Sequence, residues 1–308
     1  MTRSLDIVVL LGGVSSERDI SLMTGQAVIE VLREHGHSVR EFDTQEGPEK
    51  LFRALSPKPD VVFNALHGRF GEDGRLQGIL DFLEIPYTHS GLLASALAMD
   101  KPAAKRLFRE AGIQCPDHLI VDTEMAVVKE FMPRPYVIKP LNNGSSLGVH
   151  IINNDQNFQK LIEQDWGFGD QVMIERYIPG REITVAVMGD RALGVTELYP
   201  NSGFYDFSSK YTEGKTKHVI PADIPGAISE LAMQTGLLAH KTLGCRGITR
   251  SDFRYNDNEP GKKGLYLLEL NTQPGLTPLS LVPEQAAFSG IAFHDLVNWM
   301  VENAKCDR

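Results

Sequence analysis

The first third of the chain alternates short apolar runs with stretches of helical periodicity. Leu5–Leu11 and Pro59–Leu66 are almost continuously apolar, and a glycine follows each within two residues. Such runs are typical of parallel strands that are buried on both faces. Helical spacing follows each run, at Ile20, Met23, Ala27 and Val31 and then at Leu76, Ile79, Leu80 and Leu83. With a short strand predicted at 85–88, this order indicates an α/β domain with a parallel sheet that ends near residue 95.

The middle of the chain changes to a helical stretch followed by a hairpin. Residues 92–111 are rich in Ala, Leu, Lys and Met, which favour helix. The runs 136–140 and 149–152 predict two paired strands, and 172–176 predicts a third. We therefore expect a small central domain over 96–180.

Strands and helices alternate again beyond residue 180. The pattern over 225–243 predicts a helix that Pro225 opens and Gly244 ends. We expect a mixed α/β and α+β fold whose domains cover 1–95, 96–180 and 181–308.

Residues 200–218 interrupt this alternation. They are mostly polar, show no sustained periodicity and include Gly203 and Gly214. An irregular segment of this length is commonly a functional loop, so we expect a lid over 200–218. Lys210 and Tyr211 could then place a cation and a phenol over a site, although an ordinary exposed loop would also explain them.

Composition and charge exclude several classes of protein. The 308 residues are 42% hydrophobic and 23% charged, which is ordinary for a globular protein, and the net charge of −9 disfavours a nucleic-acid partner. No apolar run approaches the length of a membrane span, and no signal peptide is visible. The three cysteines are far apart and odd in number, which indicates free thiols in a reducing compartment. We expect a cytoplasmic protein with neither nucleic-acid nor membrane partners.

Oxygen ligands are concentrated on two candidate strands near the C-terminus. Within 265–271, strand periodicity puts Glu269 and Asn271 on one face, and the strand predicted at 247–254 offers Asp252. If these strands pair, the three side chains form an all-oxygen cluster suited to Mg²⁺ shared with nucleotide phosphates. They could instead be ordinary solvated residues, but carboxylates that face one way repel each other without a cation.

A glycine-rich loop could wrap phosphates. The connector 141–148 contains Gly144, Gly148 and two serines, and Lys139 precedes it at a strand end. Glycines let the backbone approach a phosphate, and hydroxyls and an ammonium add donors. The loop matches neither a Walker A nor a Rossmann pattern, so a plain hairpin turn remains an alternative.

Three further segments place polar residues at strand or helix ends. Glu17 follows Gly12-Gly13 at a strand–helix junction, where open α/β sheets bind ligands. The simpler explanation is helix capping, with Ser15 or Ser16 as N-cap and Glu17 favouring the helix dipole, and a degenerate dinucleotide loop is another alternative. The turn 67–74 holds three glycines and four ionisable groups, a density that favours a ligand site. Lys101 lies in a helical region, where a lone lysine usually faces solvent.

Taken together, these motifs resemble those of the D-alanine–D-alanine ligases in the ATP-grasp superfamily. They occur in the family's order through nearly the whole chain: GGVSSERDIS, HGRFGEDG, MDK, VIKPLNNGSSLG, FYDFSSKY, RSDF and LLELNTQPG. The resemblance implies an ATP-grasp fold with an N-terminal parallel-sheet domain, and ATP bound between the central and C-terminal domains. It further implies two Mg²⁺ ions, for which Mn²⁺ can substitute, and synthesis of D-alanyl-D-alanine for peptidoglycan through an acyl phosphate. We also expect a homodimer.

The resemblance implies a role for each matching residue. Glu17 would hold the ammonium of the first D-alanine near His67, and would form a hydrogen-bonded triad with Ser145 and Tyr211. Arg250 would stabilise the oxyanion. The remaining sets are Ser280 and Leu281 for the second D-alanine; Lys101, Lys139, Ser146, Glu175, Tyr177, Ile178, Glu182 and Lys210 for the nucleotide; and Asp252, Glu269 and Asn271 for metal.

Two segments depart from the pattern of the family. Ser251 stands where the family usually has an aliphatic residue, and 255–266 is a longer connection, which predicts an extended exposed hairpin away from the chemistry. Two other functions stay open. A D-alanine–D-lactate ligase is disfavoured by Tyr211, and a nucleotide-binding protein without catalysis is disfavoured by the presence of Arg250 with all three metal residues.

Overall fold

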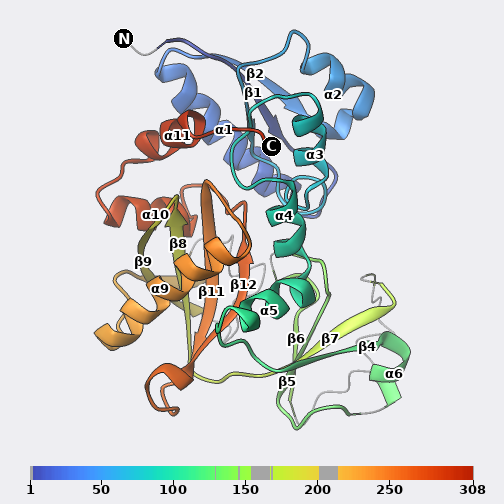
Figure 1. Ribbon diagram of the computed structural model, residues 1–308, viewed down its shortest axis with the longest axis vertical. Coiled ribbons are helices and arrows are strands. Elements are labelled where there is room, and N and C mark those ends of the chain that lie inside the picture. Colours follow the sequence, from blue (N-terminus) through green and yellow to red (C-terminus); the bar gives the residue numbers. More distant parts are fainter. Residues whose placement is uncertain are drawn as a thin grey trace.

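In the computed structural model, the described residues form three sheets that follow one another along the molecule (Figure 1). The structure describes residues 3–128, 130–144, 146–153, 167, 169–200 and 214–307. The first sheet lies at one end, and the central sheet lies at the other (Figure 1). This arrangement agrees with the mixed α/β and α+β organisation predicted from the sequence.

The first sheet is parallel and is covered on both faces. Its strand order is β2-β1-β3, and residues 7, 9 and 11 of β1 pack in one core while residues 8 and 10 pack in another. The alternation explains why β1 is apolar throughout. Its elements are β1 (Asp6–Leu11), α1 (Arg18–Glu34), β2 (Ser38–Asp43), η1 (Thr44–Glu46), α2 (Pro48–Ala54), β3 (Val61–Asn64) and α3 (Arg75–Phe82).

Details of this sheet differ from the predictions. The strand expected at 85–88 is wrong, because Tyr87 makes only isolated bridges, to Val62 and Lys305. Met23 of α1 is 48% exposed, since the buried face of that helix is set by residues such as Thr24 and Val28. The chain also returns here at its end: α11 (Phe293–Glu302) packs beside α1 (Figure 1).

Two helices separated by one residue replace the single helical stretch expected at 92–111. They are α4 (Leu92–Met99) and α5 (Lys101–Glu110). Asp100 separates them with an extended backbone, and its carboxylate accepts a hydrogen bond from the backbone N–H of Ala103 at 2.9 Å. This N-cap starts a new helix and turns Lys101 towards the interior.

The central sheet has the order β4-β7-β5-β6 and is antiparallel. The hairpin predicted over 136–152 is confirmed by the pairing of β5 with β6. Its elements are β4 (His118–Asp122), α6 (Thr123–Val128), β5 (Tyr136–Lys139), β6 (His150–Ile152) and β7 (Gln171–Arg176).

The third sheet is antiparallel, in the order β10-β9-β8-β11-β12. The helix predicted over 225–243 is confirmed and lies on one face, while α10 covers the other; Gly244 follows the helix with a φ of +69°. The elements are β8 (Arg181–Met188), β9 (Arg191–Pro200), β10 (Thr216–Val219), α9 (Gly226–Thr242), β11 (Ile248–Tyr255), η2 (Gly261–Gly264), β12 (Leu265–Asn271) and α10 (Leu281–Phe288).

The segments 200–218 and 255–266 differ in part from what the sequence predicts. The end of the predicted lid is wrong, because Thr216 pairs with Pro200 in a regular β10–β9 ladder. Residues 201–213 lie outside the described residues. The long connection after Tyr255 is largely exposed and joins the antiparallel strands β11 and β12 as a hairpin, as predicted, but its loop folds into η2 instead of extending the strands.

Ser251 occupies a regular position in β11. It pairs with Val185 and Leu270, so the serine does not disturb the register. Its side chain is fully buried, and its hydroxyl has no hydrogen-bond partner among the described residues. A buried, unpaired hydroxyl carries a desolvation cost without compensation.

We predict that Ser251→Ala stabilises the protein by about 1 kcal/mol, since it removes this cost and creates little empty space. Urea unfolding measures the change. The matched control is Thr184→Val on the neighbouring strand, because the Thr184 hydroxyl donates to Asp252 at 2.8 Å. That variant should lose stability, and loss of stability in both variants would contradict the prediction.

Candidate functional site

Two adjoining pockets open where the three sheets approach one another. The first is lined by Glu17, His67 and Glu72 of the N-terminal part and by Arg250 and Ser280 of the C-terminal part. The second lies between the central and C-terminal sheets. Both pockets are lined by Lys101, Asn143 and Glu269, so these three residues stand where a group bound in one pocket meets a group bound in the other.

Strand pairing places the three residues of the predicted oxygen cluster on one face of the third sheet. In the antiparallel pairing of β11 with β12, Asp252 is opposite Glu269 and Arg250 is opposite Asn271. The ladder shifts register directly after Asp252. The side chains of Asp252 and Glu269 are only 14% and 26% exposed, so they are not ordinary solvated residues.

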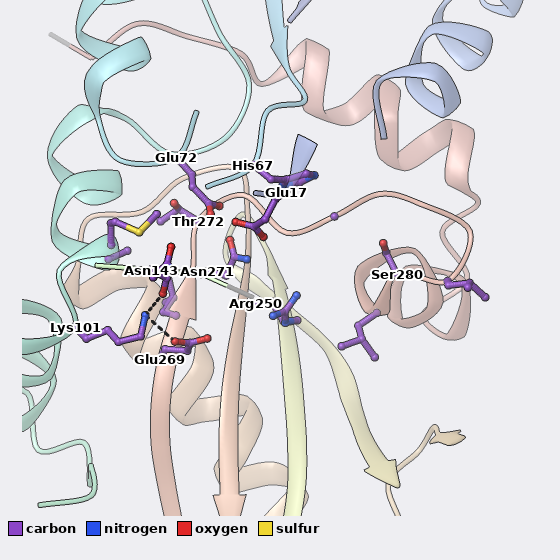
Figure 2. A pocket seen from close by; sticks show the side chains of 17 residues that line it. Glu17, His67, Glu72, Lys101, Asn143, Arg250, Glu269, Asn271, Thr272 and Ser280 are labelled. Atoms are coloured by element: carbon purple, nitrogen blue, oxygen red, sulfur yellow. Dashed lines mark hydrogen bonds and ion pairs between the residues drawn. The ribbon is translucent and has the colours of Figure 1, made fainter. Parts of the chain in front are cut away.

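Cations of the chain itself offset the two carboxylates. The Arg250 guanidinium donates to both oxygens of Asp252 at 2.8 Å, and Lys101 Nζ lies 3.1 Å from Glu269 Oε2 (Figure 2). Lys101 also donates to the carbonyl of Asn143 at 2.6 Å. It is buried at the start of α5, so the expectation of a solvated lysine is wrong.

The donor set at this position fits a hard divalent cation. Asp252, Glu269 and Asn271 offer carboxylate and amide oxygens, the ligand types that Mg²⁺ prefers. Among the described residues, no three His, Cys, Asp or Glu side chains gather as a self-sufficient metal cluster. A cation held here would therefore need further oxygen ligands, which nucleotide phosphates can supply.

Glu17 points into the first pocket instead of capping its helix. It occupies the N-cap position of α1, but its side chain makes no capping hydrogen bond and is 5% exposed. A Cβ added at Gly68 or Gly144 would lie 2.7 or 3.1 Å from Glu17 Oε2. Both glycines thus allow the backbone to close around this carboxylate. Of the two serines considered as caps, Ser15 accepts a hydrogen bond from the backbone N–H of Glu17 at 3.2 Å, while Glu17 itself holds the N-cap position.

Glu72 is a second buried carboxylate in the same pocket (Figure 2). Its Oε1 accepts a hydrogen bond from the backbone N–H of Gly68 at 2.8 Å. Burial, together with the negative charge of Glu17, raises the pKa of Glu72 to about 8. The carboxyl group of Glu72 is therefore largely protonated at neutral pH.

His67 lines the pocket, but both of its ring nitrogens are used within the protein. Nδ1 donates to the carbonyl of Gln273 at 3.2 Å, and Nε2 lies 3.2 Å from the hydroxyl of Thr24. Burial lowers the pKa of His67 to about 4, so the ring is neutral at physiological pH. It contributes shape to the pocket more than charge.

The second pocket contains most of the residues predicted for the nucleotide. Glu175 lies between two lysines at its floor: Lys139 Nζ is 2.7 Å from Oε1, and Lys105 Nζ is 2.5 Å from Oε2. Burial opposes ionisation of Glu175, but the two lysines outweigh it and lower its pKa. The predicted residues that line this pocket are Lys101, Lys139, Ser146, Glu175, Tyr177, Ile178 and Glu182.

The remaining predicted residues divide between the first pocket and the part of the chain that is not described. Ser280 and Leu281 line the first pocket at the start of α10, where Ser280 Oγ accepts from the backbone N–H of Thr277 at 3.0 Å. The glycine-rich loop serves both pockets, because Gly144 lines the first and Ser146 the second. Ser145, Lys210 and Tyr211 lie outside the described residues.

Comparisons with known proteins agree with this geometry. A family model described as D-ala D-ala ligase C-terminus matches residues 107–302, and one described as D-ala D-ala ligase N-terminus matches 40–90. The chain belongs to the D-alanine–D-alanine ligase family. A D-alanine–D-alanine ligase of Granulibacter bethesdensis is 53% identical over 97% of this chain and 98% of its own, and one of Parvibaculum lavamentivorans is 51% identical over the full length of both.

Solved structures of this ligase family share the fold. The D-alanine–D-alanine ligase of Bacillus anthracis is 31% identical and covers 97% of both chains with a TM-score of 0.83. A structure of the Bacillus anthracis ligase complexed with ATP is 30% identical and covers 98% of this chain and 97% of its own, with a TM-score of 0.81. The ATP-grasp fold predicted from the motifs is thereby confirmed.

Sequence reasoning missed Glu72 and Arg254, which line the pockets, and Lys105, which pairs with Glu175 beneath the second. Glu72 was within a segment predicted to bind a ligand, and its spacing from His67 gave no reason to single it out. Lys105 lies one helical turn after Lys101, which is a signal that both face the same way. Arg254 lies two residues after Asp252 on the same strand face, and period-2 alternation could have identified it.

We predict that Glu72 makes the ligand-free protein lose stability as the pH rises. The folded-state pKa of Glu72 is about 8, above the ordinary 4.5. Its contribution to the free energy of unfolding is therefore fully present below pH 4.5 and is lost as the pH rises through 8. Glu72→Gln removes this loss, so its stability relative to wild type should rise by roughly 1–3 kcal/mol between pH 5 and 8.

Urea unfolding of wild type and variant at both pH values measures this difference. His67 acts in the opposite sense, because its lowered pKa removes stability as the pH falls from 6.5 to about 4, but it does so in both proteins. Glu110→Gln on the exposed face of α5 is the control. A difference that stays constant with pH would show that Glu72 is ionised in the folded protein.

Proposed function

We propose that this chain joins two D-alanines to D-alanyl-D-alanine at the expense of ATP, for the synthesis of peptidoglycan precursors. The observation that carries the proposal is the meeting of the two pockets at Lys101, Asn143 and Glu269. A phosphoryl donor in the second pocket can there reach an acceptor carboxylate in the first. Membership of the ligase family supports the same reaction.

The ATP complex of the Bacillus anthracis ligase supports ATP as the nucleotide, and we assign it to the second pocket. Glu175, Tyr177, Ile178 and Glu182 hold the base and ribose. Lys101, Lys139 and Ser146 face the phosphates, together with Lys210 from outside the described residues. The buried lysines neutralise phosphate charge in a site with little water, where such interactions are strong.

Mg²⁺ is the metal that the oxygen donors at the junction fit. Asp252, Glu269 and Asn271 would hold it, with two ions in all and Mn²⁺ as a possible substitute. The metal supplies charge neutralisation on the phosphates during transfer.

The first pocket holds the two amino acids. Glu17 pairs with the ammonium of the first D-alanine, and Ser280 and Leu281 position the second. A carboxylate oxygen of the first D-alanine attacks the γ-phosphorus, and ADP leaves. The unprotonated amine of the second then attacks the carbonyl carbon, phosphate leaves, and the nitrogen releases its extra proton to solvent. Arg250 stabilises the oxyanion of that step, and Ser145 and Tyr211 complete a hydrogen-bonded triad with Glu17.

The wider organisation is part of the proposal. The proposed domains cover 1–95, 96–180 and 181–308, which the separation of the chain into three sheets supports, and the residues that precede β10 serve as the lid. The protein acts as a homodimer in the cytoplasm. No helix among the described residues has the length and apolarity needed to span a bilayer.

Phosphate release from ATP tests the function. With Mg²⁺ and D-alanine, release should be rapid, and mass spectrometry should find one dipeptide for each phosphate. L-alanine should give no product, while D-serine and D-lactate as second substrates define the tolerance of the site. Binding of ATP without any D-alanine-dependent phosphate release would identify a nucleotide-binding protein and refute the ligase.

We predict that Glu17→Gln raises the KM for D-alanine far more than the KM for ATP. Truncating one partner of a desolvated charged pair typically costs about 2–5 kcal/mol, and Glu17 lines the first pocket and not the second. Steady-state kinetics with each substrate varied in turn measure both constants. Glu49→Gln on exposed α2 is the control. Equal increases in the two KM values would mean that Glu17 does not hold the amino acid.

A further inference from the structure

The linker between the central and C-terminal sheets forms part of the wall of the second pocket. β7 ends at Arg176 and β8 begins at Arg181, so residues 177–180 are the connection. Tyr177 and Ile178 line the pocket. Linker residues belong to no strand, and their carbonyl groups need donors from elsewhere to hold one position.

Arg254 supplies those donors from the neighbouring strand β11. Its Nε donates to the carbonyl of Ile178 at 3.0 Å, and its Nη2 donates to the carbonyl of Gly180 at 2.8 Å. The guanidinium carbon also lies 5.8 Å from the centre of the Tyr177 ring. The planar fork of an arginine can make all of these contacts at once, which a lysine cannot.

The same guanidinium holds Glu182. Nη1 donates to Glu182 Oε2 at 3.3 Å, and the two residues are directly opposite in the β11–β8 ladder. Their side chains are 16% and 13% exposed, and both line the second pocket. An ion pair that is largely removed from water is stronger than a surface pair and fixes the direction in which the carboxylate points.

The backbone of the linker is packed tightly against the same strand. Gly180 has a φ of +97°, and a Cβ at this position would lie 2.2 Å from the carbonyl oxygen of Tyr255. The backbone of the linker therefore lies directly against the end of β11, with no room for a larger residue at Gly180. A change in the position of the Arg254 side chain would therefore alter the position of Ile178 in the pocket wall.

We propose that Arg254 is a positioning residue for the nucleotide. It fixes the linker against which the base lies and orients Glu182 towards the ribose hydroxyls. The inference rests on the proposed function in one respect, namely that the second pocket takes ATP. Arg254 acts through Ile178, Gly180 and Glu182 and is assigned no chemical step.

Calorimetric binding of ATP and of 2′,3′-dideoxyATP, which lacks both ribose hydroxyls, tests this role. Wild type should prefer ATP. In Arg254→Ala, the dissociation constant for ATP should rise by about tenfold and the preference over the dideoxy nucleotide should largely disappear. Glu182→Gln should lose the same preference, and the double variant should lose no more than either single variant.

Arg181→Ala is the matched control. Arg181 is adjacent to the linker and pairs with Glu197 and Asp257, but it does not line the second pocket. Its loss should leave both dissociation constants within about twofold of wild type, as expected for a side chain without a nucleotide contact. Arg254→Lys retains a cation opposite Glu182 and should recover part of the ribose preference. It also provides the measurement if Arg254→Ala does not fold.

If Arg254→Ala weakened the binding of both nucleotides equally and kept the preference for ATP, the proposal would be overturned, because Arg254 would then act on stability alone. An unchanged affinity for ATP would overturn it as well. Ligation by the wild type is measured separately. A wild type that binds ATP without forming dipeptide would refute the ligase and leave the role of Arg254 standing.

Discussion

The antiparallel pairing of β11 with β12 is the constraint on which the rest of the site depends. It places Asp252 directly opposite Glu269, and like charges in such a cross-strand position destabilise a sheet. Arg250 and Lys101 offset that repulsion in the protein by itself. In the proposed reaction, Arg250 also stabilises the oxyanion and Lys101 also contacts the phosphates. The same two cations therefore neutralise the carboxylates and the reacting groups.

The other sheets bring their groups to this pair through short, tightly packed turns. The turn after β3 contributes Glu72, and the start of α1 contributes Glu17, with Gly68 and Gly144 closed around the latter. The central sheet contributes Lys139 and Glu175 to the other pocket. Each pocket therefore combines residues from distant parts of the sequence, and the junction at Lys101, Asn143 and Glu269 connects donor to acceptor.

Much of the fold followed from sequence pattern, because buried strands and capped helices have strong local signals. The edge strand β2 has a half-exposed, polar sequence and gave none, and the strand expected at Tyr87 is only a bridge. Asp252, Glu269 and Asn271 could be placed together from strand periodicity alone. The ion pair of Lys101 with Glu269 could not, since it depends on how α5 packs against the sheet, and the contacts of Arg254 with the linker likewise depend on tertiary packing.

Transfer of oxygen from D-alanine to phosphate tests the central claim most directly, namely that the two pockets connect a phosphoryl donor with a carboxylate. D-alanine labelled with ¹⁸O in its carboxyl group is incubated with ATP and Mg²⁺, and the products are analysed by mass spectrometry. The account predicts one ¹⁸O atom in each inorganic phosphate released, because the attacking carboxylate oxygen leaves with the phosphoryl group. Unlabelled phosphate, or label in AMP, would contradict it.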